Sequence, residues 1–506
     1  MELKLNKQPL YPSEVLLDTT VEQPVECDAM LPDDCPDLVR VLRCVMTPVV
    51  TARRLNGGQL EVEGIARLTV YYVASGEELT KAEFKVPFSR LMELRGEAQS
   101  PGVTVSAAPG YINCRGVGQR RLDIRGAVTL TVRVIHCRKE EAVSGGEEPE
   151  LELREEQVDG VRILGQESRE SHLEQTLELT YGKPPILRIL RWQCSPRIVE
   201  CRASGGRVSV KGELEVRMLY HSVSGEWEQM NFTVPAAAAL EMEGADEDSL
   251  CDSRMEVLSL ELEPGEDGQG ENRCVVLTGS VLFTVRIHGG YQAQICTDCY
   301  STRHPCTFRT RRHTLLREVR PVRDPFPMRQ TMPLPENTQQ VLDLWSEPGS
   351  WSLRPEAGGV GIEGKITLCM LVKTKEGEIL YLDKNVPFTQ KLNMELPAGQ
   401  TDLRLEAESS DFALTGGGAE LRCQLVLEGM IYLTGEQSVI ESLEVDEKKP
   451  REGLMAPGLY LYLAEEGESL WEIAKRYNTS IRRIQEENPE EERQPGKREV
   501  LLVPVI

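Results

Sequence analysis

Apolar and polar residues alternate along much of the chain, and this alternation predicts a mainly β protein. Around residue 215, for example, Leu214, Val216 and Met218 alternate with charged side chains. A period of two is typical of an antiparallel strand with one face on a core and the other in water. We therefore predict half-buried antiparallel sheets over most of the sequence.

A repeated pattern divides this β region into three units. Pro48, Gly64 and Pro87 are separated by 16 and 23 residues. The same spacing recurs twice, in Pro196, Gly212 and Pro235 and in Pro348, Gly364 and Pro387. In each unit a strand follows the central glycine, and a second strand carries the last proline, which we place at the strand end. Each unit of about 150 residues is predicted to be an independent antiparallel sandwich or open barrel.

The composition between the units suggests where they begin and end. We predict β repeats at residues 1–138, 161–307 and 308–444, with an acidic, mobile linker at 139–160 and a second linker at 445–457. A helical-looking apolar pattern precedes the first proline of each unit, at residues 37–44, 186–193 and 339–346.

The last segment, residues 458–506, has a different pattern, which predicts a small α+β module. A strand is expected at 459–464 and another at 500–503. Between them, Ser469 and Glu472 form a capping box, and the apolar residues that follow recur at helical spacing. Asn478 is a left-handed helix end, and Ser480 caps a second helix before Pro489. The predicted order is β, α, α, β.

Trp471 lies about 100° around the first of these helices from Leu470, off the apolar stripe. Two interpretations stay open. The indole packs against a neighbouring strand or helix end, or it is a surface anchor of the type enriched at binding hot spots.

Charge and composition narrow the classes of partner. The net charge of −23 argues against nucleic acid and against adhesion to anionic lipid. The N-terminal residues do not resemble a secretion signal, and no run approaches the roughly 18 apolar residues of a membrane helix. We therefore expect a cytoplasmic protein whose 14 cysteines are reduced.

Candidate chemistry is sparse. Cys296, Cys299, His304 and Cys306 contain a CxxC pair that could hold zinc, but there is no second CxxC and the segment looks like one strand continuing into the next unit. The sequence has no phosphate-binding loop, no HExxH and no GxSxG motif. We expect a non-enzyme with no catalytic residues, no cofactor and no bound metal.

The C-terminal module resembles a LysM domain. The resemblance is carried by Tyr462, Gly467–Trp471, Ile473, Ala474, Tyr477, Asn488, Pro489, Pro495, Gly496 and Leu502–Pro504. LysM domains usually bind N-acetylglucosamine polymers between the loop before the first helix and the loop after the second. The resemblance thus implies a glycan- or partner-binding groove formed by Gly467, Glu468, Ser469, Leu470, Trp471, Ile484, Asn488 and Pro489. Glutamates at 465, 466, 468 and 490–492 would give this groove an acidic rim, which suits a basic protein surface better than a neutral glycan.

The three β units resemble SPOCS domains, which occur in spore coat assembly proteins of spore-forming bacteria. The Pro/Gly/Pro pattern and the segment Thr297–Thr302 carry this resemblance, and the third unit has Gly435–Ser438 at the corresponding place. It implies a non-enzymatic adaptor in the mother-cell cytoplasm, at the forespore surface. The LysM module would dock onto the polymerising coat ATPase (stage IV sporulation protein A), with other coat proteins as further partners.

Two alternatives remain. The first is a cell-wall protein that binds peptidoglycan through LysM, which needs an export route. The second is an enzyme with a metal site at the cysteine cluster.

Overall fold

The computed structural model describes residues 4–75, 78–97, 101–148, 150–356, 359–392, 399–416, 418–446, 448–449, 456–488 and 499–505. Antiparallel strands account for most of these residues, and the two helices among them lie in the C-terminal module. The prediction of a mainly β protein with a small α+β domain at its end is confirmed.

Three units of six strands form the body of the molecule. Unit 1 contains β2 (Ser13–Met30), β3 (Leu38–Asn56), β4 (Gln59–Ala74), β5 (Leu79–Glu93), β6 (Gly102–Gly116) and β7 (Arg121–Cys137). Unit 2 contains β9 (Leu151–Glu178), β10 (Ile186–Ser204), β11 (Arg207–Ser222), β12 (Trp227–Glu241), β13 (Leu250–Gly265) and β14 (Cys274–Ser301). Unit 3 contains β15 (Cys306–Met332), β16 (Thr338–Glu356), β17 (Gly359–Thr374), β18 (Ile379–Leu392), β19 (Gly399–Thr415) and β20 (Gly418–Val445).

The three units share one topology. In each, the second, third and fourth strands form one sheet, and the first, sixth and fifth strands form the other, in those orders. The apolar faces of the two sheets pack on each other, and each unit has its own core cluster. Each unit is therefore a β-sandwich, which is one of the two architectures predicted from the sequence.

The segments with a helical apolar pattern are strands, so that prediction is wrong. They form the first part of β3, β10 and β16, and each contains two β-bulges three residues apart. The bulges lie at Leu38/Arg40 and Val41/Arg43, at Ile186/Arg188 and Ile189/Arg191, and at Thr338/Gln340 and Val341/Asp343. Because each bulge adds one unpaired residue, the alternation of faces shifts twice. Apolar residues then recur at spacings of three and four, as they would on a helix.

The repeated prolines and glycines have clear structural roles. The prolines lie inside the outer strands of the three-stranded sheets and not at strand ends, as Pro48 does opposite Ala66. An outer strand tolerates proline because the missing N–H can face away from the ladder. At Gly64, an added Cβ would come within 2.6 Å of the Val49 backbone oxygen and would also clash with the ring of Phe88. Because the Val49 carbonyl belongs to the backbone and cannot swing away as a ring can, its close approach explains why a side chain is excluded there.

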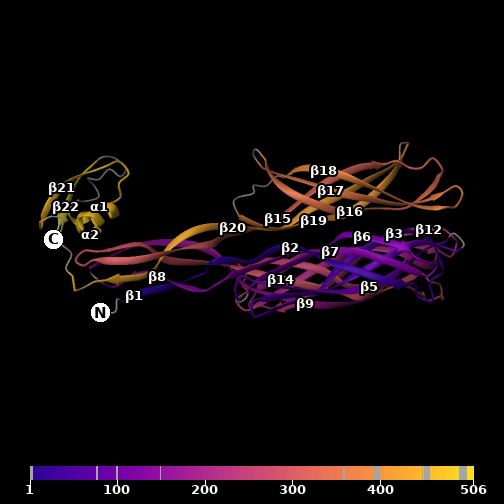
Figure 1. The fold of residues 1–506 in the computed structure, drawn as a ribbon, viewed down its shortest axis with the longest axis horizontal. Helices are drawn as coiled ribbons and strands as arrows, with labels where there is room; N and C mark the ends of the chain where they lie inside the picture. Colours follow the sequence, from indigo (N-terminus) through magenta and orange to yellow (C-terminus); the bar gives the residue numbers. More distant parts are fainter. Residues whose placement is uncertain are drawn as a thin grey trace.

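The segment predicted as a mobile acidic linker is paired β structure. Residues 139–160 contain β8 (Glu140–Gly146), which pairs with β1 (Leu5–Leu10), and the start of β9, which pairs with the end of β14. These pairs prolong the first and last strands of units 1 and 2 beyond their sandwiches, and β15 and β20 do the same in unit 3. We call these extensions the three ribbons. They lie together as a stalk to one side of the sandwiches (Figure 1).

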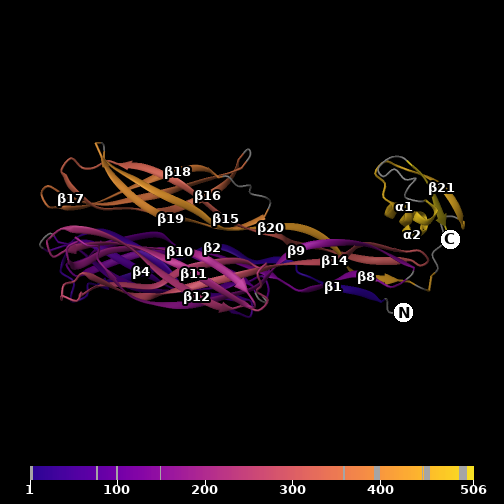
Figure 2. The ribbon, with the colours of Figure 1, turned by 180° about the vertical axis from the view of Figure 1, so that it is seen from behind.

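Apolar contacts between the units show that they are arranged around a common axis. One cluster contains Leu42, Leu190 and Leu342, each six residues before the first proline of its unit. The same cluster contains Tyr71, Leu219 and Leu371, each seven residues after the central glycine. Because three similar units contribute equivalent positions to one cluster, they form an approximate three-fold arrangement within a single chain. Figure 2 shows unit 3 lying along units 1 and 2.

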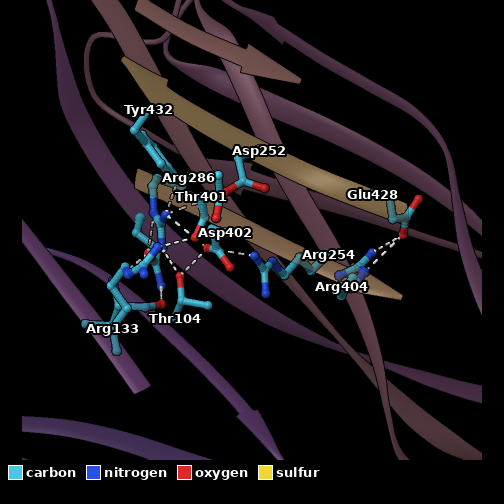
Figure 3. A network of polar contacts seen from close by, with 12 residues as sticks. Thr104, Arg133, Asp252, Arg254, Arg286, Thr401, Asp402, Arg404, Glu428 and Tyr432 are labelled. Atoms are coloured by element: carbon cyan, nitrogen blue, oxygen red, sulfur yellow. Dashed lines mark hydrogen bonds and ion pairs between the residues drawn. The ribbon is translucent and has the colours of Figure 1, made fainter. Parts of the chain in front are cut away.

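A polar network joins the three units where the sandwiches meet the ribbons (Figure 3). The buried guanidinium of Arg286 in unit 2 donates to the Thr104 hydroxyl of unit 1 at 2.8 Å and to the Tyr432 hydroxyl of unit 3 at 2.7 Å. Asp402 of unit 3 accepts from Thr104 at 2.7 Å and pairs with Arg254 of unit 2 at 2.8 Å. Burial raises the pKa of Asp402, but the charges and hydrogen bonds of its partners outweigh this effect and the pKa is lowered. Each of these five residues is paired across a unit boundary, so the network fixes the units relative to one another.

The C-terminal module has the predicted β-α-α-β order. It consists of β21 (Gly458–Ala464), α1 (Leu470–Tyr477), α2 (Ile481–Glu487) and β22 (Glu499–Val505). Ser469 and Glu472 form both bonds of the capping box, Asn478 is left-handed at φ 53°, and Ser480 caps α2. The module lies at the far end of the ribbons from the sandwiches, on the side where the N-terminus also lies (Figure 1).

Candidate docking site at the C-terminal module

The C-terminal module contacts the tip of the ribbon formed by β9 and β14 through Trp471. The indole Nε1–H donates to Asp298 Oδ2 at 2.7 Å, and Lys475 Nζ, one turn further along α1, donates to Oδ1 and Oδ2 of the same carboxylate at 2.6 and 2.8 Å. Trp471 is 7% exposed. The indole of Trp471 is therefore packed against a neighbouring strand and is not a surface anchor. That strand, β14, belongs to unit 2.

Tyr300 completes this contact. Its ring lies edge-on to Trp471, with centroids 5.1 Å apart, and its hydroxyl donates to the backbone carbonyl of Thr479 at 2.8 Å. Tyr300 therefore belongs to the same buried cluster as Ile473 and Ile484 of the module. Since residues alternate between the two faces of a strand, Asp298 and Tyr300 are presented on the same side of β14.

The electrostatics of Asp298 favour its charged form. Burial raises the pKa of this carboxyl, but the hydrogen bonds from Lys475 and Trp471 lower it by more, so its pKa lies below the ordinary value. Lys475 also lies over the ring of Phe308, 5.6 Å from its centroid. The ammonium is thereby held between a carboxylate and an aromatic face, both contributed by the body of the protein.

The first half of the groove implied by the resemblance is engaged in the module's own fold. Gly467 has φ +83°, and the turn it occupies is closed by a bond from Glu468 N to Glu465 O at 3.2 Å. The Glu468 carboxylate accepts from the Tyr462 hydroxyl and forms an ion pair with Arg476 at 2.8 Å. Ser469 caps α1. Glu468, predicted to belong to an acidic rim, is thus neutralised within the module.

The second half of the groove is engaged in the same way. Ile484 is fully buried, and Leu470 is half-buried against the same cluster. The Asn488 amide donates to Ile484 O at 2.6 Å and to Leu502 O at 2.7 Å, and its oxygen accepts from Leu502 N at 2.8 Å. Asn488 therefore ties β22 to the end of α2. Pro489 and the glutamates at 490–492 lie outside the described residues.

The cysteine cluster is only partly assembled. Cys299 and Cys306 face each other with their sulfur atoms 3.7 Å apart, across the turn between β14 and β15. His304 instead faces Glu150 and the backbone of Lys449, and Cys296 is buried on β14. Within the described ranges, no group of three or more His, Cys, Asp or Glu side chains is placed to hold a metal ion.

Sequence reasoning missed Asp298 as a partner of the module. The segment Thr297–Thr302 carries part of the family resemblance, so the sequence does contain a signal at this place. Its spatial partner could not be inferred, because the contact joins residues separated by 173 positions.

Among the described residues, no helix has both the length and the apolar character needed to cross a membrane.

Comparison with known families gives two matches. The family model described as SipL, SPOCS domain, matches residues 185–264, which cover β10–β12 and most of β13 in unit 2. The LysM domain model matches residues 462–491. No curated protein and no solved structure matches the chain. Both matched domains are non-catalytic binding domains.

The fold and the two matches define a β-sandwich repeat protein with a terminal binding module, in the context of sporulation. The chain is a SPOCS- and LysM-domain protein that resembles SipL. The LysM match suggests binding to a carbohydrate or to a protein.

Proposed function

We propose that the protein is a structural adaptor in assembly of the bacterial endospore coat. In this role its LysM module docks onto the polymerising coat ATPase, stage IV sporulation protein A, on the forespore surface in the mother cell. The observation that carries the proposal is the presence of a SPOCS match and a LysM match in one chain. Three interlocked sandwiches serve as a scaffold, and the ribbons hold the module away from it.

The state of the module favours a protein partner over a glycan. Trp471, the aromatic residue in the implied groove, is buried against Tyr300, and Asn488 is engaged with β22. A sugar chain entering the groove would have to displace these contacts. A protein can instead use a surface that leaves them in place.

Glycan binding is the alternative function, because the LysM match itself suggests it. In this alternative the protein binds N-acetylglucosamine polymers through Gly467–Trp471 and the region of Ile484 to Pro489. It predicts that occupation of the groove is accompanied by a change in the environment of Trp471.

The test is a binding titration with the full chain. The protein is titrated with the purified coat ATPase and, separately, with soluble N-acetylglucosamine oligomers. Binding to the ATPase that the oligomers do not inhibit supports the adaptor. Binding to the oligomers alone, reversed by excess free sugar, supports the glycan-binding function and contradicts the adaptor.

A further inference from the structure

The outer face of the β21–β22 sheet is apolar and exposed. Three cross-strand pairs lie on it: Leu459 opposite Pro504, Leu461 opposite Leu502, and Leu463 opposite Val500. We call these six residues the leucine face. Directly opposed residues of an antiparallel pair share one face of the sheet. The alternate residues Ala464, Leu501 and Val503 point inward and are buried under the helices.

The exposure of this face is unusual within the chain. Leu459, Leu461, Leu463 and Val500 are 54%, 76%, 59% and 61% exposed. Four of the 14 large apolar side chains found exposed among the described residues are therefore gathered on two seven-residue strands. Single exposed leucines are ordinary, whereas a contiguous apolar patch marks an interaction surface.

The position of the leucine face suits docking. The helices α1 and α2 lie toward the ribbon tip, and β21 lies at the outer end of the molecule (Figures 1 and 2). A partner can therefore reach the sheet without touching the sandwiches. Docking there also leaves intact the contact between Trp471 and Asp298.

We propose that the leucine face, and not the groove, is the surface through which the LysM module docks onto its protein partner. The inference rests on the proposed adaptor function and names the surface that performs it. The six side chains offer no hydrogen-bonding group, so they match an apolar protein surface and not a hydroxyl-rich sugar.

Charge identifies the rim of that partner surface as basic. Glu465 and Glu466 follow β21 directly and are exposed, and neither carboxylate has an ion-pair partner among the described residues. They are available to pair with lysine or arginine around an apolar centre, an arrangement that steers association and fixes orientation. A second copy of this chain fits poorly, since each carries a net charge of −23 and would bring the same glutamates.

The test uses the full-length protein with the purified coat ATPase as probe. Leu461→Asp places a charge at the centre of the face, and Leu461→Met keeps an apolar side chain of similar size. Leu414→Asp is the matched control, because Leu414 is 62% exposed on β19 in unit 3. We expect Leu461→Asp to weaken binding at least tenfold and the other two variants to change it by less than threefold. Unchanged thermal unfolding confirms that each variant is folded.

A second variant tests the basic rim. Replacing both Glu465 and Glu466 by Lys should weaken binding about tenfold at low salt, and added salt should reduce the difference from the wild type. If this replacement leaves binding unchanged, the assignment of a basic rim is overturned.

The outcomes separate this inference from the proposed function. If the wild type does not bind the ATPase, the adaptor function fails and the inference fails with it. If the wild type binds and Leu461→Asp binds equally well, the leucine face is not the docking surface, while the function stands. If ultracentrifugation shows a wild-type dimer that Leu461→Asp abolishes, the occupant is a second copy. Competition by N-acetylglucosamine oligomers would place binding in the groove. Either of these last two results overturns the inference.

Discussion

Asp298→Ala tests whether one carboxylate at the ribbon tip holds the C-terminal module against the body of the protein. The change removes the acceptor of the Trp471 indole, at 2.7 Å, and the ion-pair partner of Lys475, at 2.6 Å. The ring contact between Tyr300 and Trp471 and the module's own core remain. We therefore expect the module to stay folded and its attachment to weaken.

The size of the effect follows from these contacts. A hydrogen bond to a charged acceptor contributes about 1.5–3 kcal/mol. The ion pair adds about 0.5 kcal/mol, because the Lys475 side chain is 40% exposed and water screens the charges. The loss is then about 2–3.5 kcal/mol, and the ratio of docked to released module falls about 30- to 300-fold, at about 1.4 kcal/mol for each factor of ten.

Fluorine NMR of protein containing 5-fluorotryptophan measures this ratio. The chain has five tryptophans, and the Trp471 resonance is assigned by its absence in Trp471→Phe. In Asp298→Ala the resonance should move to the position of a released module. The control is Asp159→Ala, because Asp159 is exposed on the neighbouring strand β9. A Trp471 resonance that is identical in Asp298→Ala and wild type would refute the reasoning.

Further predictions concern pH and two buried contacts. Because the docked-state pKa of Asp298 is lowered, its contribution to docking is complete above the ordinary aspartate value of about 3.9 and is lost as pH falls through the docked-state pKa. The Trp471 resonance should be constant between about pH 5 and about pH 7 and should shift only at more acid pH. Asp298→Asn should remove this acid transition. Asn488→Ala should destabilise the module by about 2 kcal/mol, through loss of the amide bonds to Leu502, and should speed hydrogen exchange of β22, with Glu487→Ala as control. Asp343→Ala should destabilise the three-unit body by about 3–5 kcal/mol in chemical denaturation, because it leaves the buried Arg191, 2.6 Å away, without its counter-charge. The control is Asp383→Ala, at an exposed position, and an equal loss of stability in that variant would contradict the prediction.

Local signals made the C-terminal module predictable. Ser469, Asn478 and Ser480 mark helix ends within a few residues of the helices they terminate, and the structure has each cap as expected. The alternation in each unit likewise predicted the sandwich strands, because one face of each sheet packs on a core.

The remaining features depend on contacts between distant residues. Paired bulges in β3, β10 and β16 produced a helical pattern that no local rule separates from a helix. The ribbon start at 151–160 looked like a linker because a two-stranded ribbon buries little surface, so that a charged residue such as Glu155 is accommodated on its exposed side. The partnership of Trp471 with Asp298 required knowing that β14 continues past its sandwich.

The ribbons also set a length scale. β14 pairs with β13 only as far as His288, and its 13 residues from Gly289 to Ser301 pair with β9 alone. At about 3.3 Å per residue, this extension spans about 40 Å. The three ribbons pack against one another through shared apolar clusters, so together they resist bending more than a single ribbon would. A surface bound by the LysM module and a surface bound by the sandwiches would therefore be kept apart by a built-in spacer, so the protein could set the separation between two layers as well as join them.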